Sequence, residues 1–424
     1  MKRSAIQHRG EPRGNRVRAR ISETTGRGQR TYTPTLAIIE RARGSTLYTA
    51  DGRRLIDFAS GVLVANLGHN HPGFERRFRG YSQGLPRTSY NIATPIEAEA
   101  ARRVLQSMKR NRNAEKVLWA ASGSEGIQKA IWAALACDPG RSIMAATAGG
   151  FHGKKGLAGD VSGESSADPN VRFISFPRAG QLTPDDMRRE LDALERAHRG
   201  KIALLITEPY LGAAGSYHPP KWYHPLLQEW CQKHGVIFIF DEVQSCHGRT
   251  GAMYAHETYG VEPDLVVLGK GLGNGEPVAA VVGRAVVIDS LDYGEASDTF
   301  SGNPMACAAV CAVLDVFREE KVLAQCRRNA RLLAKLLNDL RRAFPFVRDV
   351  RGEGMVYGVE MAREDVAEAC VLEAYRGAGK SGVHFLGPLA GRVLRVSPPL
   401  TISEGELKRA QSVLMKGWAR VNWA

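Results

Sequence analysis

The stretch Val236-Ile-Phe-Ile-Phe-Asp241-Glu-Val-Gln244 and the run Asp264-Leu-Val-Val-Leu-Gly-Lys270 that follows it decide the fold. Each is a short apolar run that ends abruptly in a charged residue. That pattern is typical of a strand buried on both faces of a parallel sheet. Because ligands bind outside the carboxyl ends of such strands, we expect Asp241 and Lys270 to project into one site.

An acid and an amine at one edge of a sheet suit a pyridine cofactor. The acid keeps the ring nitrogen protonated, and the amine forms a Schiff base with an aldehyde. The alternative at this point is a structural ion pair, since charged residues are common at strand ends.

Length and composition set the broad class of the protein. A chain of 424 residues can bury a large core and is long enough for two domains. It has no apolar run as long as a membrane span and no apolar segment of a secretory signal after its first Met. The seven Cys residues are scattered without metal-type spacing. We therefore expect reduced thiols, a cytoplasmic protein and no metal site.

The excess positive charge is concentrated at the N-terminus. Residues 1–30 hold nine Lys or Arg and two Glu, which is +7 of the total of +14. This segment is poor in apolar residues, so we expect a disordered, solvated arm. Recognised nucleic-acid motifs and interleaved aromatic residues are missing from it, so we do not expect nucleic acid as a partner.

Apolar runs alternate with amphipathic segments along the middle of the chain. This alternation predicts an α/β fold, with a large doubly wound, mostly parallel sheet. Short strands and helices near the C-terminus predict a smaller α+β domain. The expected division is a basic arm at 1–30, an N-terminal part of the small domain at 31–68, a large domain at 69–300 and a C-terminal small domain at 301–424.

Two further segments follow predicted strands and are candidates for ligand binding. Ser122-Gly123-Ser124 stands at a helix start, where free backbone N–H groups suit a phosphate. An ordinary N-cap explains the same residues equally well. Phe151 lies in Gly149-Gly-Phe-His-Gly153, where an aromatic ring can lie on a ring ligand or serve packing alone.

Taken together, the motifs resemble those of the class III aminotransferases, pyridoxal-phosphate enzymes of fold type I that include ornithine and 4-aminobutyrate aminotransferases. The match extends from about Gly44 to the C-terminus. It rests on the following stretches in their order: Asp241-Glu-Val-Gln244, Gly248-Arg-Thr-Gly251, Pro263-Asp264, Lys270-Gly-Leu-Gly273, Thr299-Phe-Ser-Gly-Asn-Pro304 and Arg395-Val-Ser-Pro-Pro-Leu400.

The resemblance implies pyridoxal 5'-phosphate as cofactor, a homodimer with shared active sites, and a role for each matching position. Lys270 corresponds to the Schiff-base lysine, Asp241 to the partner of the ring nitrogen, and Gln244 to the residue that bonds the ring hydroxyl. Val243 and Phe151 correspond to the residues on the two faces of the ring. The other implied positions are Gly123 and Ser124 at the phosphate, Thr299 at the phosphate of the partner subunit, Glu208 near the ring, and Arg395, Val62 and Lys154 at the substrate.

Departures from the family pattern bear on the substrate. In the ornithine and 4-aminobutyrate enzymes an acid stands five residues after the Glu of Glu-Pro and can neutralise the carboxylate-binding arginine. Here that position is Ala213, so Arg395 is expected to stay available for a substrate carboxylate. Lys154 replaces an arginine and cannot fork onto a carboxylate. Cys246 and His247 replace a glycine and an aromatic residue, which we attribute to local packing.

The resemblance favours an aminotransferase that moves an amino group from an amine or amino acid to a 2-oxo acid by a ping-pong mechanism. An isomerase (racemase, epimerase or aminomutase) or a decarboxylase of the same fold is the alternative, because these enzymes use the same lysine and aspartate. A purely binding or regulatory module is disfavoured, since Lys270 and Asp241 are both present.

Overall fold

A computed structural model describes residues 6–178, 180, 182–387 and 390–423. The chain divides into two compact units. Residues 72–323 form one unit, and the residues before 72 and after 323 form the other. Each unit has its own sheet structure and is described by itself.

The unit of residues 72–323 is built around a seven-stranded sheet with the strand order β4-β10-β9-β8-β7-β5-β6. Strand β10 pairs antiparallel with β4 and β9, and the other neighbouring pairs are parallel. The strands are β4 (Lys116–Ala120), β5 (Ile143–Thr147), β6 (Val171–Ile174), β7 (Ile202–Thr207), β8 (Ile237–Asp241), β9 (Leu265–Leu268) and β10 (Ala279–Gly283).

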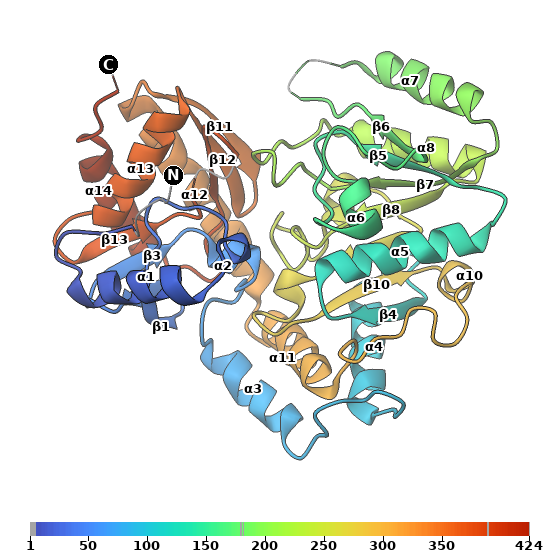
Figure 1. Ribbon diagram of the computed structural model, residues 1–424, viewed down its shortest axis with the longest axis horizontal. Coiled ribbons are helices and arrows are strands. Elements are labelled where there is room, and N and C mark those ends of the chain that lie inside the picture. Colours follow the sequence, from blue (N-terminus) through green and yellow to red (C-terminus); the bar gives the residue numbers. More distant parts are fainter. Residues whose placement is uncertain (1–5, 179, 181, 388–389, 424) are drawn as a thin grey trace. The chain divides into compact units, whose positions relative to one another are not determined.

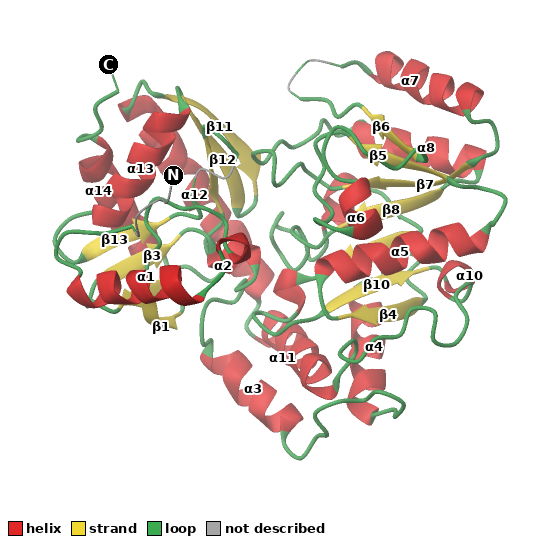
Figure 2. Ribbon diagram, viewed as in Figure 1, coloured by secondary structure: helices red, strands yellow, loops and turns green. Residues whose placement is uncertain are grey.

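Helices cover both faces of this sheet (Figures 1 and 2). Every residue of β5, β7 and β9 is buried, which explains their continuous apolar sequence. On one face, Ile127 and Ile131 of α5 (Gly123–Cys137) pack against the strands. On the other face, α8 (Tyr223–His234) contributes Leu227 to the core. The predicted α/β fold with a doubly wound, mostly parallel sheet is confirmed.

Three more helices of this unit pack together: α3 (Pro72–Ser82), α4 (Pro95–Ser107) and α11 (Pro304–Glu319). Helix α11 is rich in Ala and buried along most of its length, so it needs close neighbours on several sides. It therefore falls within the unit of residues 72–323, whereas the sequence analysis placed a boundary at 300/301.

The other unit contains two small sheets. Strands β1-β2-β3-β13 form one of them, in which β13 is parallel to β3, and β11-β12-β14 form an antiparallel sheet. The strands are β1 (Ile39–Arg43), β2 (Thr46–Thr49), β3 (Arg54–Asp57), β11 (Val347–Glu353), β12 (Val356–Met361), β13 (Ser381–His384) and β14 (Val393–Val396). The helices are α1 (Pro12–Thr24), α2 (Ser60–Leu63), α12 (Val322–Ala343), α13 (Glu364–Arg376) and α14 (Glu404–Trp418).

The basic N-terminal segment is helical where we expected disorder. Helix α1 is held by a buried ion pair in which Arg18 Nη2 donates to Glu11 Oε2 at 2.6 Å. The hydroxyl of Tyr375 on α13 donates to the same carboxylate at 2.8 Å. The expectation of disorder was wrong for residues 12–24, because a buried polar network orders this helix and apolar content does not reveal such a network.

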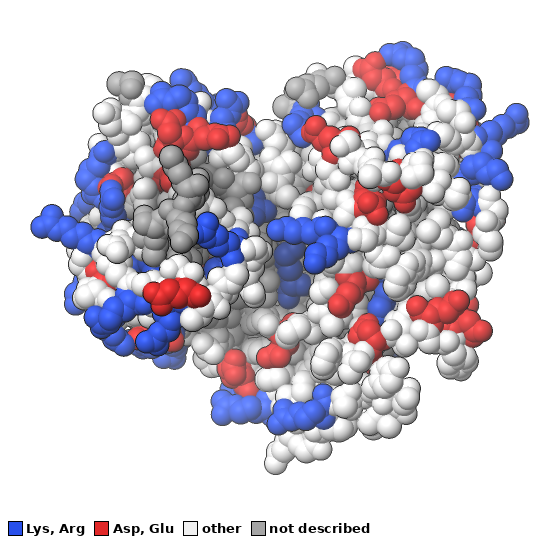
Figure 3. Space-filling view, viewed as in Figure 1, with Lys and Arg blue, Asp and Glu red and all other residues white. Residues whose placement is uncertain are grey.

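Charged side chains are mixed over the face drawn in Figure 3, where lysine and arginine alternate with aspartate and glutamate. The described helices include none that is long and apolar enough to cross a membrane.

Candidate active site

A cavity of about 180 Å³ lies at the carboxyl ends of the parallel strands of the 72–323 unit. Its walls come from the segments that end or follow β4, β5, β7, β8 and β9. The lining residues are Ser122, Gly123, Ser124, Phe151, His152, Glu208, Asp241, Val243, Gln244 and Lys270. Five separate strands therefore contribute to one small volume, as expected for an α/β sheet.

The carboxylate of Asp241, the last residue of β8, is fixed from two sides. Its Oδ2 lies 2.7 Å from Nδ1 of His152, and its Oδ1 accepts a hydrogen bond from the backbone N–H of Val243 at 2.9 Å. The residue is 4% exposed and the imidazole side chain is fully buried. A buried carboxylate with two partners keeps one orientation, so Asp241 is positioned before any ligand binds.

Glu208 follows the neighbouring strand β7 and is also buried. Its carboxylate accepts hydrogen bonds from the backbone N–H groups of Phe151 at 3.0 Å and Gly212 at 3.3 Å. Burial raises the pKa of Glu208 to about 7, and the nearby Asp241 carboxylate acts in the same direction. The nearby imidazole of His152 and the two N–H donors oppose this rise in pKa. Glu208 therefore joins the loop that carries Phe151 to the loop after β7.

Lys270 is the first residue of the short 3₁₀ helix η2 (Lys270–Leu272), just beyond β9. Its backbone has φ of 44°, in the left-handed region that non-glycine residues rarely adopt. The preceding carbonyl of Gly269 accepts hydrogen bonds from the backbone N–H of Leu272 at 2.9 Å and from the thiol of Cys246 at 3.3 Å. Strain of this kind persists only where the surroundings fix the backbone, and it is typical of functional sites.

The N-terminus of α5 forms the opposite wall. Ser122 is its N-cap, and Ser122 and Glu125 form a reciprocal capping box. A Cβ atom at Gly123 would lie 2.7 Å from Cγ1 of Val243, so only glycine permits this close approach of helix and loop. The first N–H groups of a helix and its dipole favour an anion at this place.

These residues fit a phosphorylated pyridine aldehyde. The lining offers an acid for the ring nitrogen, an amine for the aldehyde, a helix N-terminus for the phosphate and the apolar side chain of Val243 for the ring. Oε1 of Gln244 is buried and has no hydrogen-bond partner among the described residues, which leaves it ready for a polar group of a ligand. Nε2 of His152 is also buried and has no hydrogen-bond partner among the described residues.

Eight of the residues expected at the cofactor line this cavity, and four predicted site residues do not. Thr299 and Lys154 are exposed and are not part of the lining, while Val62 and Arg395 belong to the other unit. Sequence reasoning missed His152 as a partner of Asp241. The position of His152 beside Phe151, after a predicted strand, was the available signal that it belongs to the site. Its contact with Asp241 was not predictable, because the two residues are 89 positions apart in the chain.

Comparisons with known proteins show the family of this chain. The profile of a family described as aminotransferase class-III matches residues 27–416. Acetylornithine aminotransferase of Methanopyrus kandleri is 33% identical over 384 residues, covering 91% of this chain and 95% of the relative. 5-Aminovalerate aminotransferase DavT of Pseudomonas putida is 30% identical over 401 residues, covering 90% of this chain and 93% of the relative.

Solved structures of transaminases share the fold. Ornithine aminotransferase of Toxoplasma gondii superposes with a TM-score of 0.81 at 25% identity, covering 97% of this chain and 95% of that one. An amine transaminase from an uncultivated Pseudomonas species, in a form with bound pyridoxal phosphate, gives a TM-score of 0.79 at 26% identity and covers 94% of this chain and 97% of that one.

The fold and the cavity define a pyridoxal-phosphate enzyme of fold type I. Within that class, the chain belongs to the class III aminotransferases. It is an enzyme that transfers amino groups with pyridoxal 5'-phosphate as cofactor, which confirms the predicted family, activity and cofactor.

The raised pKa of Glu208 predicts a pH-dependent stability of the cofactor-free protein. Between the ordinary glutamate pKa of 4.5 and about 7, the unfolded chain loses this proton while the folded protein keeps it. The free energy of unfolding should therefore fall through this window as pH rises, by about 3 kcal/mol. In Glu208→Gln this decrease should be absent. Urea unfolding of both proteins at pH 5 and pH 8 measures the difference.

Glu229→Gln, at an exposed position of α8, is the control for removing a carboxylate. Equal pH dependence of the wild type and Glu208→Gln would contradict the raised pKa.

Proposed function

We propose that this enzyme moves an amino group from an amine or amino acid to a 2-oxo acid, in two half-reactions, with Lys270 and Asp241 as its catalytic residues. The observation that carries the proposal is the meeting of an amine, a buried carboxylate and a helix N-terminus at one cavity. Pyridoxal phosphate, when bound, supplies an electron sink for the charge left on the substrate's α-carbon.

The proposed role of each cavity residue follows from its chemistry. Asp241, oriented by His152, keeps a proton on the ring nitrogen, because a carboxylate beside it favours the charged form. Gln244 bonds the ring hydroxyl, and Val243 and Phe151 pack on the two faces of the ring. The start of α5, with Gly123 and Ser124, holds the phosphate.

Lys270 has two proposed tasks. Its amine would hold the aldehyde group of the cofactor in the resting enzyme, and it would move a proton at the α-carbon of a bound substrate. Glu208 accepts the N–H of Phe151 and so fixes the aromatic wall against the ring. Holding the cofactor and moving the proton both require the amine of Lys270 at one defined place, which the fixed backbone of Lys270 provides.

Arg395 is the proposed partner of a substrate carboxylate, and Val62 and Lys154 are proposed as further substrate contacts. The relatives are named for acetylornithine and 5-aminovalerate, which both carry a carboxylate. Ala213 lies beside Gly212 in the loop tied to Glu208, so this position borders the cavity wall without supplying a charge. An arginine suits a substrate with a carboxylate on the reacting carbon, such as a 2-oxo acid, because its guanidinium can bind a carboxylate through two hydrogen bonds.

We also propose a homodimer in which Thr299 reaches the phosphate of the partner subunit. The hydroxyl of Thr88 donates to the Thr299 carbonyl at 3.4 Å, so these two segments lie together. Beside them Tyr90, Ile92 and Phe300 are each more than half exposed, and such apolar groups suit a protein interface. Sedimentation should give twice the chain mass of 46.3 kDa, and a monomer mass would contradict the dimer.

A cytoplasmic location is proposed from the cysteines, all of which are free. Cell fractionation is the measurement that decides it.

Lys270→Ala should abolish turnover and leave the cofactor bound without a covalent link, because no other amine lines the cavity. Borohydride reduction followed by intact-protein mass spectrometry should attach one cofactor to the wild type and none to the variant. Lys155→Ala, which removes an exposed lysine of the loop after Phe151, is the matched control and should still be labelled. A reducible adduct in Lys270→Ala would refute the assignment.

Ala213→Glu should lower kcat/KM for a 2-oxo acid far more than for a simple aldehyde acceptor. The new carboxylate would compete for Arg395 with a substrate carboxylate, so the substrate loses one charge-assisted pair, worth roughly 1.5–3 kcal/mol or one to two decades in kcat/KM. Steady-state kinetics with both acceptors measure the selectivity.

The neighbouring substitution Ala214→Glu controls for the added charge and bulk. If Ala213→Glu lowers kcat/KM for both acceptors equally, or for neither, Arg395 does not bind the substrate carboxylate.

A further inference from the structure

A second hollow in the 72–323 unit lies apart from the catalytic cavity. We call it the α4–α11 pocket, because most of its walls come from the C-terminal parts of these helices. It encloses about 340 Å³, compared with about 180 Å³ for the catalytic cavity, and no residue lines both. Its lining residues are Arg103, Gln106, Ser107, Lys109, Met253, Leu314, Asp315, Phe317, Arg318 and Leu323.

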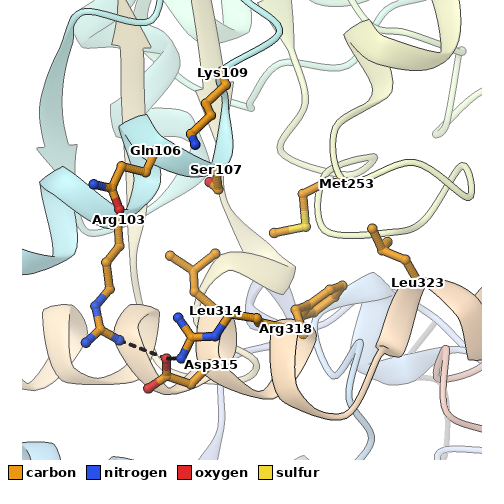
Figure 4. A pocket seen from close by; sticks show the side chains of 10 residues that line it. Arg103, Gln106, Ser107, Lys109, Met253, Leu314, Asp315, Arg318 and Leu323 are labelled. Atoms are coloured by element: carbon orange, nitrogen blue, oxygen red, sulfur yellow. Dashed lines mark hydrogen bonds and ion pairs between the residues drawn. The ribbon is translucent and has the colours of Figure 1, made fainter.

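The floor of the α4–α11 pocket is apolar. Met253, Leu314, Phe317 and Leu323 reach it from three segments of the chain. Figure 4 shows Ser107 and Lys109 on one side of the hollow, Leu314 below them, and Met253 and Leu323 across from them. Small-molecule sites measure roughly 300–1,000 Å³ and are mostly apolar with a few polar groups, so this hollow has the size and lining of such a site.

Cationic side chains outnumber acidic side chains in the lining of the pocket. Three cations and one acid belong to the lining, and the acid, Asp315, is already engaged. It accepts from Arg103 at 3.0 Å, from Arg318 at 2.7 Å and from the hydroxyl of Tyr81 at 2.5 Å (Figure 4). Lys109 pairs with no acidic side chain in the part of the chain that the structure describes. The pocket thus offers one uncompensated ammonium next to an apolar floor.

We propose that the α4–α11 pocket binds a small amphiphilic carboxylate and that its occupancy is coupled to the catalytic lysine. The apolar chain of the ligand covers Leu314 and Phe317, and its carboxylate meets the ammonium of Lys109 and the amide of Gln106. An amine of the same shape is excluded, because the ammonium of Lys109 repels it and the one acid of the lining, Asp315, already pairs with Arg103 and Arg318.

The coupling rests on a short series of contacts behind the floor. The ring of Phe317 packs edge-on against His247 with centroids 5.8 Å apart, and His247 has a left-handed backbone with φ of 53°. The next residue back, Cys246, donates its thiol to the carbonyl of Gly269, which directly precedes Lys270. A ligand against Phe317 therefore contacts a ring that packs on His247, in a strained segment that is bonded to the backbone just before Lys270.

Octanoate is the test ligand, and octylamine and octanol are comparison ligands of the same chain length. Ligand-observed NMR titration of the cofactor-loaded full-length enzyme should give a Kd on the order of 1 mM for octanoate, from the binding energy per atom of small ligands. Octylamine should not bind. Binding of octylamine as tightly as octanoate would overturn the proposed carboxylate specificity.

Two variants locate the site. Lys109→Met, at an exposed position that leaves the core intact, should weaken octanoate binding roughly three- to ten-fold, as expected for an exposed charge pair. Leu314→Phe fills the hollow and should abolish binding, with circular dichroism checking its fold. Lys221→Met, an exposed lysine outside the pocket, should change nothing. If Lys109→Met and a folded Leu314→Phe both bind like the wild type, octanoate binds elsewhere and the proposed site is wrong.

The coupling has its own readout. Octanoate should bind the cofactor-loaded and cofactor-free enzymes with affinities that differ by at least two-fold, and the affinity for pyridoxal phosphate must change by the same factor, because linkage is reciprocal. Equal affinities for the two forms would overturn the coupling.

Discussion

The burial of the Asp241 carboxylate at the end of β8 is the constraint on which the catalytic cavity depends. A charge removed from water needs partners, and this one has the imidazole of His152 and a backbone N–H. The neighbouring strand ends in Glu208, so a second carboxylate is buried nearby. The protein resolves the conflict by raising the pKa of Glu208 to about 7, which reduces its charge near neutral pH while Asp241 keeps the ring nitrogen of the proposed site protonated.

Much of this arrangement could be predicted from the sequence because it depends on local patterns. Apolar runs ending in Asp241 and Lys270 are read directly as buried parallel strands, and the carboxyl ends of such strands meet at one edge. The strand expected before Asp241 matches β8 (Ile237–Asp241), since its apolar sequence is continuous. The expectation of disorder at α1 was wrong for a different reason. A buried polar network involving Glu11 and Tyr375 holds that helix, and no local pattern in a basic segment reveals a partner more than 300 positions away.

The candidate site shows the same limit. The family resemblance implied eight of the residues that line the cavity, but it did not reveal the contact of His152 with Asp241, since a histidine between an aromatic residue and a glycine has no local signature of that partner. The α4–α11 pocket was beyond sequence reasoning for a stronger reason. Its walls come from four segments, and its one uncompensated charge, Lys109, is recognisable only once Asp315 is seen to be occupied by two guanidinium groups.

The loop after β7 links the electrostatics of the cavity to the choice of substrate. Glu208 is the acid nearest in sequence to Ala213, and both of its carboxylate oxygens are already bonded to backbone N–H groups. With a pKa of about 7 it carries only part of a negative charge at neutral pH. It therefore makes a poor counter-ion for a cation at the substrate, and Ala213 supplies none. Neither Glu208 nor Ala213 therefore competes with a substrate carboxylate. This is the physical basis for expecting a 2-oxo acid in at least one half-reaction.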